Sequence, residues 1–337
     1  MKTRKLIYLL IVIVMTISTV ISGCKSKPEG KNKIKNQNET EFSTQPKEEE
    51  EQKQVKKQNE MQDEIQDEIQ DETLNGIPEE ISSLISISGN QESSAVVINT
   101  QGGPMYDFDT TTVKEETEEI KNRDFFIVNV HQKQTKNPEL FQDKEISFEE
   151  AIKYDKESIQ MLAKVINYYK EQGKKVYVLG MSFGALMAQE LISEYGVDIA
   201  DKYLIIVGRL DMPEVIWKSF SKGGTGYFVD GVKAVPNENG IMDDPESDAI
   251  PSNSEKNVNK LAAGLGKNRY TEKLDKYDLK NITYISAMED EAVGKLSEEE
   301  INFLKSKNAK IILSEGGHSE VISNEIVNGF KTAFGLE

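Results

Sequence analysis

Cysteine and histidine are scarce in this sequence. Its 337 residues include one cysteine, which excludes a disulfide scaffold and a zinc site built from cysteine clusters. Two histidines leave little room for a histidine-rich metal centre, and we expect no metal and no other cofactor. Basic residues are also in deficit, because 41 Lys+Arg face 58 Asp+Glu and the net charge is −17. Nucleic-acid binding needs clustered Lys and Arg on phosphates, so nucleic acid is not an expected partner.

An apolar run lies near the N-terminus. Three basic residues within the first five precede the apolar residues 6–21, and Ile21-Ser22-Gly23-Cys24 ends the run. The segment is similar to a signal peptide that ends in a lipobox, the processing site of bacterial lipoproteins. This resemblance implies removal of residues 1–23 and lipidation of Cys24. The alternative is an uncleaved membrane anchor, because the run is only slightly short of a spanning helix. Both interpretations tether the protein to the cell membrane on its extracytoplasmic face.

Residues 24–76 contain very few aliphatic side chains. Lys, Glu, Gln and Asn dominate this segment, and such a composition cannot bury enough apolar area to offset chain entropy. We expect a disordered, charged stalk. Within it, a four-residue repeat spaces Met61, Ile65 and Ile69 along one potential helical stripe. Three apolar residues are too few to dock firmly, so a solvated spacer is favoured over a partner-binding helix.

Residues 77–337 alternate short β-branched runs with helical periods, and they suffice for one single-core domain. Alternating strands and helices imply a mostly parallel sheet with right-handed crossovers and helices on both faces. Ligands in such sheets bind at the carboxyl ends of the strands. The expected strands are 95–99, 125–130, 176–179, 203–207, 282–286 and 310–313, and the expected helices are 112–121, 148–169, 183–195 and 319–334.

A candidate nucleophile lies between one of these strands and the helix that follows it. Gly180-Met181-Ser182-Phe183-Gly184 matches the Gly-x-Ser-x-Gly pattern of a sharp strand-to-helix turn. Such a turn strains the serine backbone, and a side chain two positions to either side would collide with neighbouring chain. The pattern alone is weak evidence. The apolar strand before it and the apolar helix after it make it strong.

These residues resemble the α/β-hydrolase superfamily, and the resemblance covers roughly residues 95–334. In that family the chain order is serine, then an acid, then histidine, each on a loop after a strand. Here Asp290 follows the strand 282–286 with the family's spacing, and His318 follows the strand 310–313. The resemblance implies an α/β-hydrolase fold and a Ser182–His318–Asp290 triad.

The triad roles follow from the chemistry of serine. A serine hydroxyl is a poor nucleophile at neutral pH, so Ser182 needs His318 as a base, and Asp290 would fix the imidazole tautomer. Backbone N–H groups would stabilise the oxyanion, one from Phe183 and others from Gly102 and Gly103. The loop 100–104 is similar to the family's His-Gly-Gly-Pro segment, with Gln101 in the histidine's place. The histidine side chain that usually braces this loop in the family is thus replaced by a glutamine.

Several residues keep alternative interpretations. For the acid, Glu289 and Glu291 adjoin Asp290 in the same loop, and Asp211 lies where some family members place it, so these three compete with Asp290. His131 ends the expected strand 125–130 beside the oxyanion loop and could touch substrate there, although a solvent-facing or capping histidine is the favoured interpretation. An acidic cluster at 243–248 lacks calcium-loop spacing and is best interpreted as a solvated loop.

Residues 211–277 interrupt the alternating pattern, and we expect them to form a cap inserted over the active site. Four aromatic residues there would either line an acyl or side-chain pocket or seat the cap on the core. They are Trp217, Phe220, Tyr227 and Phe228.

Two functional classes remain open at this point. The favoured one is a membrane-tethered serine hydrolase that cleaves an ester, thioester or peptide bond of a small-molecule or peptide acyl substrate. The alternative is a non-catalytic binding lipoprotein, which has no need for an elbow, an acid loop and a histidine loop in this order.

Overall fold

The structure of the chain is a computed structural model that describes residues 76–121, 124–239 and 250–336. The expected signal peptide, Cys24, nearly all of the stalk and the acidic cluster at 243–248 lie outside the described residues. The expectations about them stay predictions.

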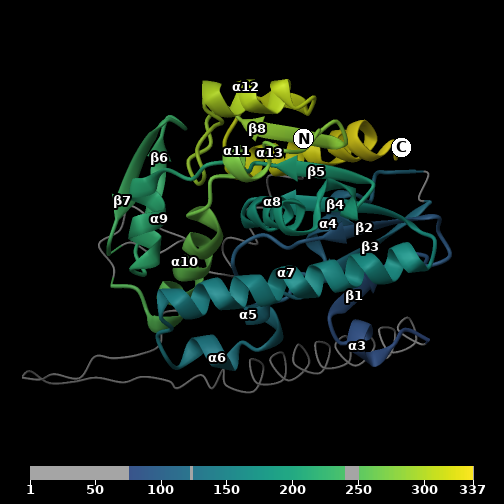
Figure 1. The fold of residues 1–337 in the computed structure, drawn as a ribbon, viewed down its shortest axis with the longest axis horizontal. Helices are drawn as coiled ribbons and strands as arrows, with labels where there is room; N and C mark the ends of the chain where they lie inside the picture. Colours follow the sequence, from purple (N-terminus) through teal and green to yellow (C-terminus); the bar gives the residue numbers. More distant parts are fainter. Residues whose placement is uncertain (1–75, 122–123, 240–249, 337) are drawn as a thin grey trace, which may run out of the picture. The chain divides into compact units, whose positions relative to one another are not determined.

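A seven-stranded sheet forms the centre of the described chain (Figure 1). Its order is β1-β3-β2-β4-β5-β8-β9, and only the β1–β3 pair is antiparallel. The predicted mostly parallel sheet is confirmed, whereas the edge strand β1 was not foreseen. The strands are β1 (Ile85–Ser88), β2 (Ala95–Asn99), β3 (Phe125–Val130), β4 (Lys175–Met181), β5 (Lys202–Ile206), β8 (Ile282–Ala287) and β9 (Lys310–Ser314).

The central strands are apolar along their length because both faces of the sheet are covered. Val96 and Ile98 of β2 belong to the core on one face, and Ala95 and Val97 belong to the core on the other. Alternate residues of one strand thus serve two cores, which is why the strand is a continuous apolar run.

Helices cover both faces, as predicted. On one face α3 (Glu79–Ser82), α7 (Phe148–Glu171), α8 (Phe183–Tyr195) and α12 (Glu298–Ser306) contribute side chains to the first core. On the other face lie α4 (Thr112–Glu116), α13 (His318–Gly329) and the π-helical segment η2 (Phe330–Phe334). The helix expected over 112–121 is shorter: it ends at Glu116, and Thr117 leaves helical geometry with φ −100° and ψ 5°. Short helical segments elsewhere are α5 (Lys133–Lys136), α6 (Glu139–Gln142) and η1 (Val197–Ile199).

The segment between β5 and β8 contains its own elements. They are α9 (Glu214–Ser221), the antiparallel hairpin of β6 (Thr225–Val229) and β7 (Lys233–Asn237), α10 (Asn253–Gly266) and α11 (Tyr270–Lys273). The hairpin packs on α9, and α10 packs on both α9 and α7 (Figure 1). Two backbone hydrogen bonds tie the hairpin to the loop after β8, from Phe228 N to Glu291 O and from Lys295 N to Gly231 O. This segment therefore borders the loop that carries Asp290.

Candidate active site

Ser182 occupies a strained turn at the carboxyl end of the central strand β4. Its backbone has φ 53° and ψ −121°, a region that non-glycine residues rarely adopt. Its N–H donates to the Ile206 carbonyl at 3.1 Å, and its own carbonyl accepts from Ala185 N at 2.9 Å. The turn thus fixes Ser182 between the sheet and the first turn of α8.

The two glycines of the predicted pattern are required by space. A Cβ on Gly180 would lie 2.5 Å from the Gly184 carbonyl oxygen. A Cβ on Gly184 would lie 2.5 Å from the Gln101 carbonyl oxygen and 2.6 Å from the Thr100 hydroxyl. The turn, the helix start and the loop after β2 therefore pack backbone against backbone.

Gly184→Ala tests this packing. Alanine is favoured over glycine inside helices by about 1 kcal/mol, so the variant is destabilised only if the cost of the collision exceeds this gain. We expect the unfolding free energy of the variant to fall by about 1–3 kcal/mol, because the new methyl group can be accommodated only if the backbone of the loop after β2 moves. Urea unfolding measures it, and a variant as stable as the wild type would contradict the close approach.

His318 and Asp290 are joined by hydrogen bonds. The Nδ1 atom of His318 lies 2.9 Å from Oδ2 of Asp290 and 3.0 Å from Oδ1. Asp290 is 1% exposed, and its Oδ1 also accepts the backbone N–H groups of Ala292 and Val293 at 3.0 and 2.8 Å. A carboxylate fixed in this way assigns the imidazole proton to Nδ1 and leaves Nε2 free to accept one.

Ser182 and His318 line the same cavity, which has a volume of about 880 Å³. Among the described residues, no hydrogen bond joins the serine hydroxyl to the imidazole. Such bonds are often long in enzymes without substrate and shorten when substrate binds. Ser182 and His318 thus meet at one cavity, and the buried Asp290 is joined to them through its hydrogen bond with His318.

The loop after β2 faces Ser182. Gly103 and Phe183 line the cavity with Ser182, and a Cβ on Gly102 would lie 3.7 Å from the Met181 carbonyl oxygen. Phe183 is the first residue of α8, whose leading N–H groups have no helical partner of their own. The predicted donors Phe183, Gly102 and Gly103 therefore gather around the serine turn.

Gln101 stands at the position where the resemblance implies a histidine, and hydrogen bonds to neighbouring segments hold the loop there. The residue is buried, has φ 63°, and donates from Nε2 to the Asp109 carbonyl at 3.0 Å. Gln132 donates from its Nε2 to the Thr100 carbonyl at 2.9 Å and to the Gln101 carbonyl at 3.3 Å. Gln132 was not singled out from the sequence, because no motif relates it to a loop some thirty residues earlier.

Glu291 entered the sequence analysis only as a neighbour of Asp290, and its contact with His318 was not foreseen. Its Oε2 accepts the backbone N–H of His318 at 3.1 Å, and the residue lines the cavity. Consecutive residues of one loop therefore hold the histidine, Asp290 by its ring and Glu291 by its backbone.

Glu291→Ala should lower kcat by about fivefold, because an exposed hydrogen bond contributes about 1 kcal/mol. Glu291→Gln keeps an acceptor oxygen and should recover most of the activity. Steady-state kinetics on one ester distinguishes the two variants. Equal losses in both would show that charge, rather than the hydrogen bond, is what matters.

Asp211, one of the competing acids, belongs to another network. Its Oδ2 accepts from the Thr271 hydroxyl at 2.6 Å and from Arg269 Nη2 at 3.2 Å. The structure thus pairs His318 with Asp290, and Asp211 fastens the start of the inserted segment to its end.

His131 stacks on Phe108 with ring centroids 3.6 Å apart, and its Nδ1 lies 3.0 Å from the Thr135 hydroxyl. It is not among the residues that line the cavity of Ser182. Burial lowers the pKa of His131 to about 4. It is therefore neutral at neutral pH.

This pKa gives a pH prediction. The unfolded histidine binds a proton below about pH 6.5, whereas the folded one does so only near pH 4. Stability should therefore fall as the pH drops through this window. His131→Gln should make the urea midpoint less sensitive to acid there, and an unchanged slope would contradict the assignment.

Three of the four candidate pocket aromatics line the cavity, namely Phe220, Tyr227 and Phe228, and Trp217 does not. Within the described ranges, no group of three His, Cys, Asp or Glu side chains is placed to hold a metal ion. In the same ranges, no helix has the length and apolar character needed to cross a membrane.

No protein-family model matches the sequence, and no curated protein matches it. Solved structures do resemble it. An alpha/beta hydrolase enzyme from a Medee basin deep-sea metagenome library aligns with a TM-score of 0.47 and 12% identity, over 75% of this chain and 94% of that chain. A bromoperoxidase from Bacillus anthracis gives 0.45 and 15%, over 74% and 93%. Est1E from Butyrivibrio proteoclasticus gives 0.43 and 15%, over 74% and 93%.

The strand order and the site of this chain identify its fold independently of any single alignment. An antiparallel edge strand precedes a parallel sheet, the turn at Ser182 follows the central strand β4, and the loops that carry Asp290 and His318 follow β8 and β9. The described chain has the α/β-hydrolase fold.

Proposed function

We propose that the protein is a serine hydrolase that cleaves an ester, thioester or amide bond through an acyl-enzyme intermediate. The observation that carries the proposal is the Asp290–His318 hydrogen bond on the rim of the cavity that also contains the strained Ser182. A base fixed by a carboxylate and a nucleophile on a rigid turn are the parts that acyl transfer needs.

In the first half of the reaction, the Ser182 hydroxyl oxygen attacks the substrate carbonyl while its proton passes to Nε2 of His318. Asp290 stabilises the imidazolium that results. The backbone N–H groups of Phe183 and of the loop at Gly102 and Gly103 stabilise the oxyanion. When the tetrahedral intermediate collapses, the leaving group takes the proton from His318, and the acyl group stays on Ser182 as an ester.

In the second half, water enters and gives a proton to Nε2 of His318 as its oxygen attacks the acyl-enzyme. Collapse of this second intermediate returns the proton to Ser182 and releases the carboxylic acid. The same base thus serves both halves, so one histidine after the serine in the chain is sufficient.

A binding lipoprotein without catalysis is the competing proposal, and pre-steady-state kinetics separates the two. An acyl-enzyme route predicts a rapid burst of p-nitrophenol from an activated ester, stoichiometric with enzyme, before a slower steady state. A protein that only binds would retain the intact ester and release no chromophore. A burst therefore supports the hydrolase proposal. If neither a burst nor steady-state turnover is seen, the hydrolase proposal is overturned.

We also propose that Cys24 carries a lipid anchor on the extracytoplasmic face of the cell membrane. The support is the sequence Ile21-Ser22-Gly23-Cys24 after an apolar run. The wild type should incorporate labelled fatty acid, and Cys24→Ser should leave an unprocessed precursor. A mature wild-type protein recovered without acylation would refute the anchor.

A further inference from the structure

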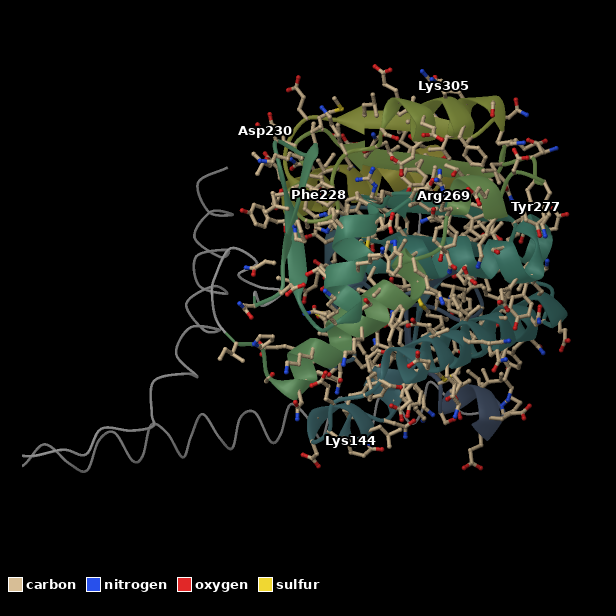
Figure 2. All side chains as sticks on the ribbon, turned by 60° about the vertical axis from the view of Figure 1, so that its left-hand side comes forward. Lys144, Phe228, Asp230, Arg269, Tyr277 and Lys305 are labelled. Carbon is tan, nitrogen blue, oxygen red and sulfur yellow. The ribbon has the colours of Figure 1, made fainter. Side chains whose placement is uncertain are left out.

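The cavity beside Ser182 has an apolar inner wall that is built largely by the segment between β5 and β8. Leu186 of α8 is joined there by Ile216 and Phe220 of α9, Phe228 of β6 and Ala262 of α10. Each of these five side chains is at most 8% exposed. We call this set the acyl wall. Figure 2 shows Phe228 on the strand that borders the body of the domain, with Asp230 farther along the same hairpin.

The close packing of the hairpin on α9 keeps this wall in place. A Cβ on Gly226 of β6 would lie 2.6 Å from Cδ1 of Ile216. The strand can approach the helix only because residue 226 has no side chain. Ile216 and Phe228 thereby lie on one continuous apolar surface.

Arg209 also lines the cavity, but its charge is compensated. Its Nη2 lies 3.0 Å from Oε2 of Glu300, and its guanidinium is 5.4 Å from the centroid of the Phe228 ring. Glu300 is buried and accepts backbone N–H groups of Leu210 and Asp211 as well. The cation is therefore held within its own network and does not make the inner wall a site for an anion.

The outer part of the cavity has a different character. Met105 and Val229 are 45% and 41% exposed, and Glu291 and Ala292 are exposed beside His318. In an acyl-enzyme route the leaving group must depart before water enters, whereas the acyl group stays attached to Ser182 through both halves. An open rim suits the departing group, and an enclosed wall suits the group that stays.

We infer that the substrate is an ester or thioester whose acyl part is an uncharged aliphatic chain longer than acetyl, bound against the acyl wall. This inference rests on the proposed hydrolase function and adds the substrate class. Burial of each methylene should raise kcat/KM by about fourfold until the chain reaches the end of the wall. An acyl group that ends in a carboxylate would lose its hydration there without gaining a partner.

The test uses the full-length chain and a series of p-nitrophenyl esters: acetate, butanoate, hexanoate, octanoate and hemisuccinate. We expect kcat/KM to rise on the order of a hundredfold from acetate to hexanoate, with hemisuccinate below butanoate. A maximum at acetate, or hemisuccinate above butanoate, overturns the substrate class while leaving the hydrolase intact. No turnover of any ester, together with no fluorophosphonate labelling, refutes the hydrolase itself and the inference with it.

Two aromatic-to-alanine changes on α9 form a matched pair. Phe220 lines the cavity and Trp217, on the same helix, does not. Phe220→Ala should shift the preferred ester toward longer chains, and Trp217→Ala should leave the length profile as in the wild type. A length profile that shifts equally in both variants contradicts the acyl wall. Thermal unfolding of each variant checks that it is folded. If either variant does not fold, the ester series measured on the wild-type protein decides the inference alone.

Discussion

Ser182→Ala should abolish ester hydrolysis and fluorophosphonate labelling. Loss of the nucleophile in a serine triad lowers turnover by a factor on the order of 10⁶. The fold should persist, since the turn is held by backbone hydrogen bonds to Ile206 and Ala185 that alanine retains. Turnover of an activated ester, with thermal unfolding as the check on folding, measures the effect.

Ser319 provides the control for this variant. It is the other serine among the described residues that line the cavity, and it lies next to His318 in the chain. Ser319→Ala should therefore keep fluorophosphonate labelling. If labelling is lost in this variant and persists in Ser182→Ala, the assignment of the nucleophile is wrong.

Asp290→Asn should lower kcat by about 10⁴, the loss seen when a serine protease triad acid becomes an amide. The amide no longer accepts the Nδ1 proton as a carboxylate does, so the imidazole adopts the wrong tautomer and the imidazolium is left unpaired. The steady-state rate on the preferred ester measures the loss, and folding is verified by circular dichroism.

Asp211→Asn is the matched acid-to-amide change. Its carboxylate pairs with Arg269 and Thr271, so we expect a small loss of stability and nearly normal turnover. If Asp211→Asn loses most of its turnover and Asp290→Asn loses little, the acid is the residue after β5, and the pairing of Asp290 with His318 has no role in catalysis.

The sheet and its covering helices could be predicted because their patterns are local. The apolar run in β4 and the apolar helix α8 lie on either side of one glycine-flanked serine, and the observed bounds of α8 match the expected 183–195. Strand β1 was missed, since the four residues Ile85–Ser88 are too short for alternation to stand out. The helix α12 was missed as well, because its nine residues are fewer than the roughly 11–18 over which a helical apolar period is recognised.

Some residues of the site could likewise be predicted from local sequence patterns, and others could not. Ser182, Asp290 and His318 follow strands in a fixed chain order, and chain order is visible in a sequence. Gln132 and Glu291 act through hydrogen bonds to the backbone of distant segments, at Thr100 and His318. Such contacts form only when the fold brings distant segments together. No sequence pattern marks them, so they could not be predicted from the sequence.

Mapping of the fluorophosphonate adduct by peptide mass spectrometry is the sharpest test of the triad. The full-length chain is labelled at neutral pH, digested and sequenced, with the Asp290→Asn variant treated in parallel. We expect one adduct, on the peptide that contains Ser182, formed much more slowly in the variant. An adduct on another residue, or a labelling rate that does not depend on Asp290, would contradict a Ser182–His318–Asp290 triad.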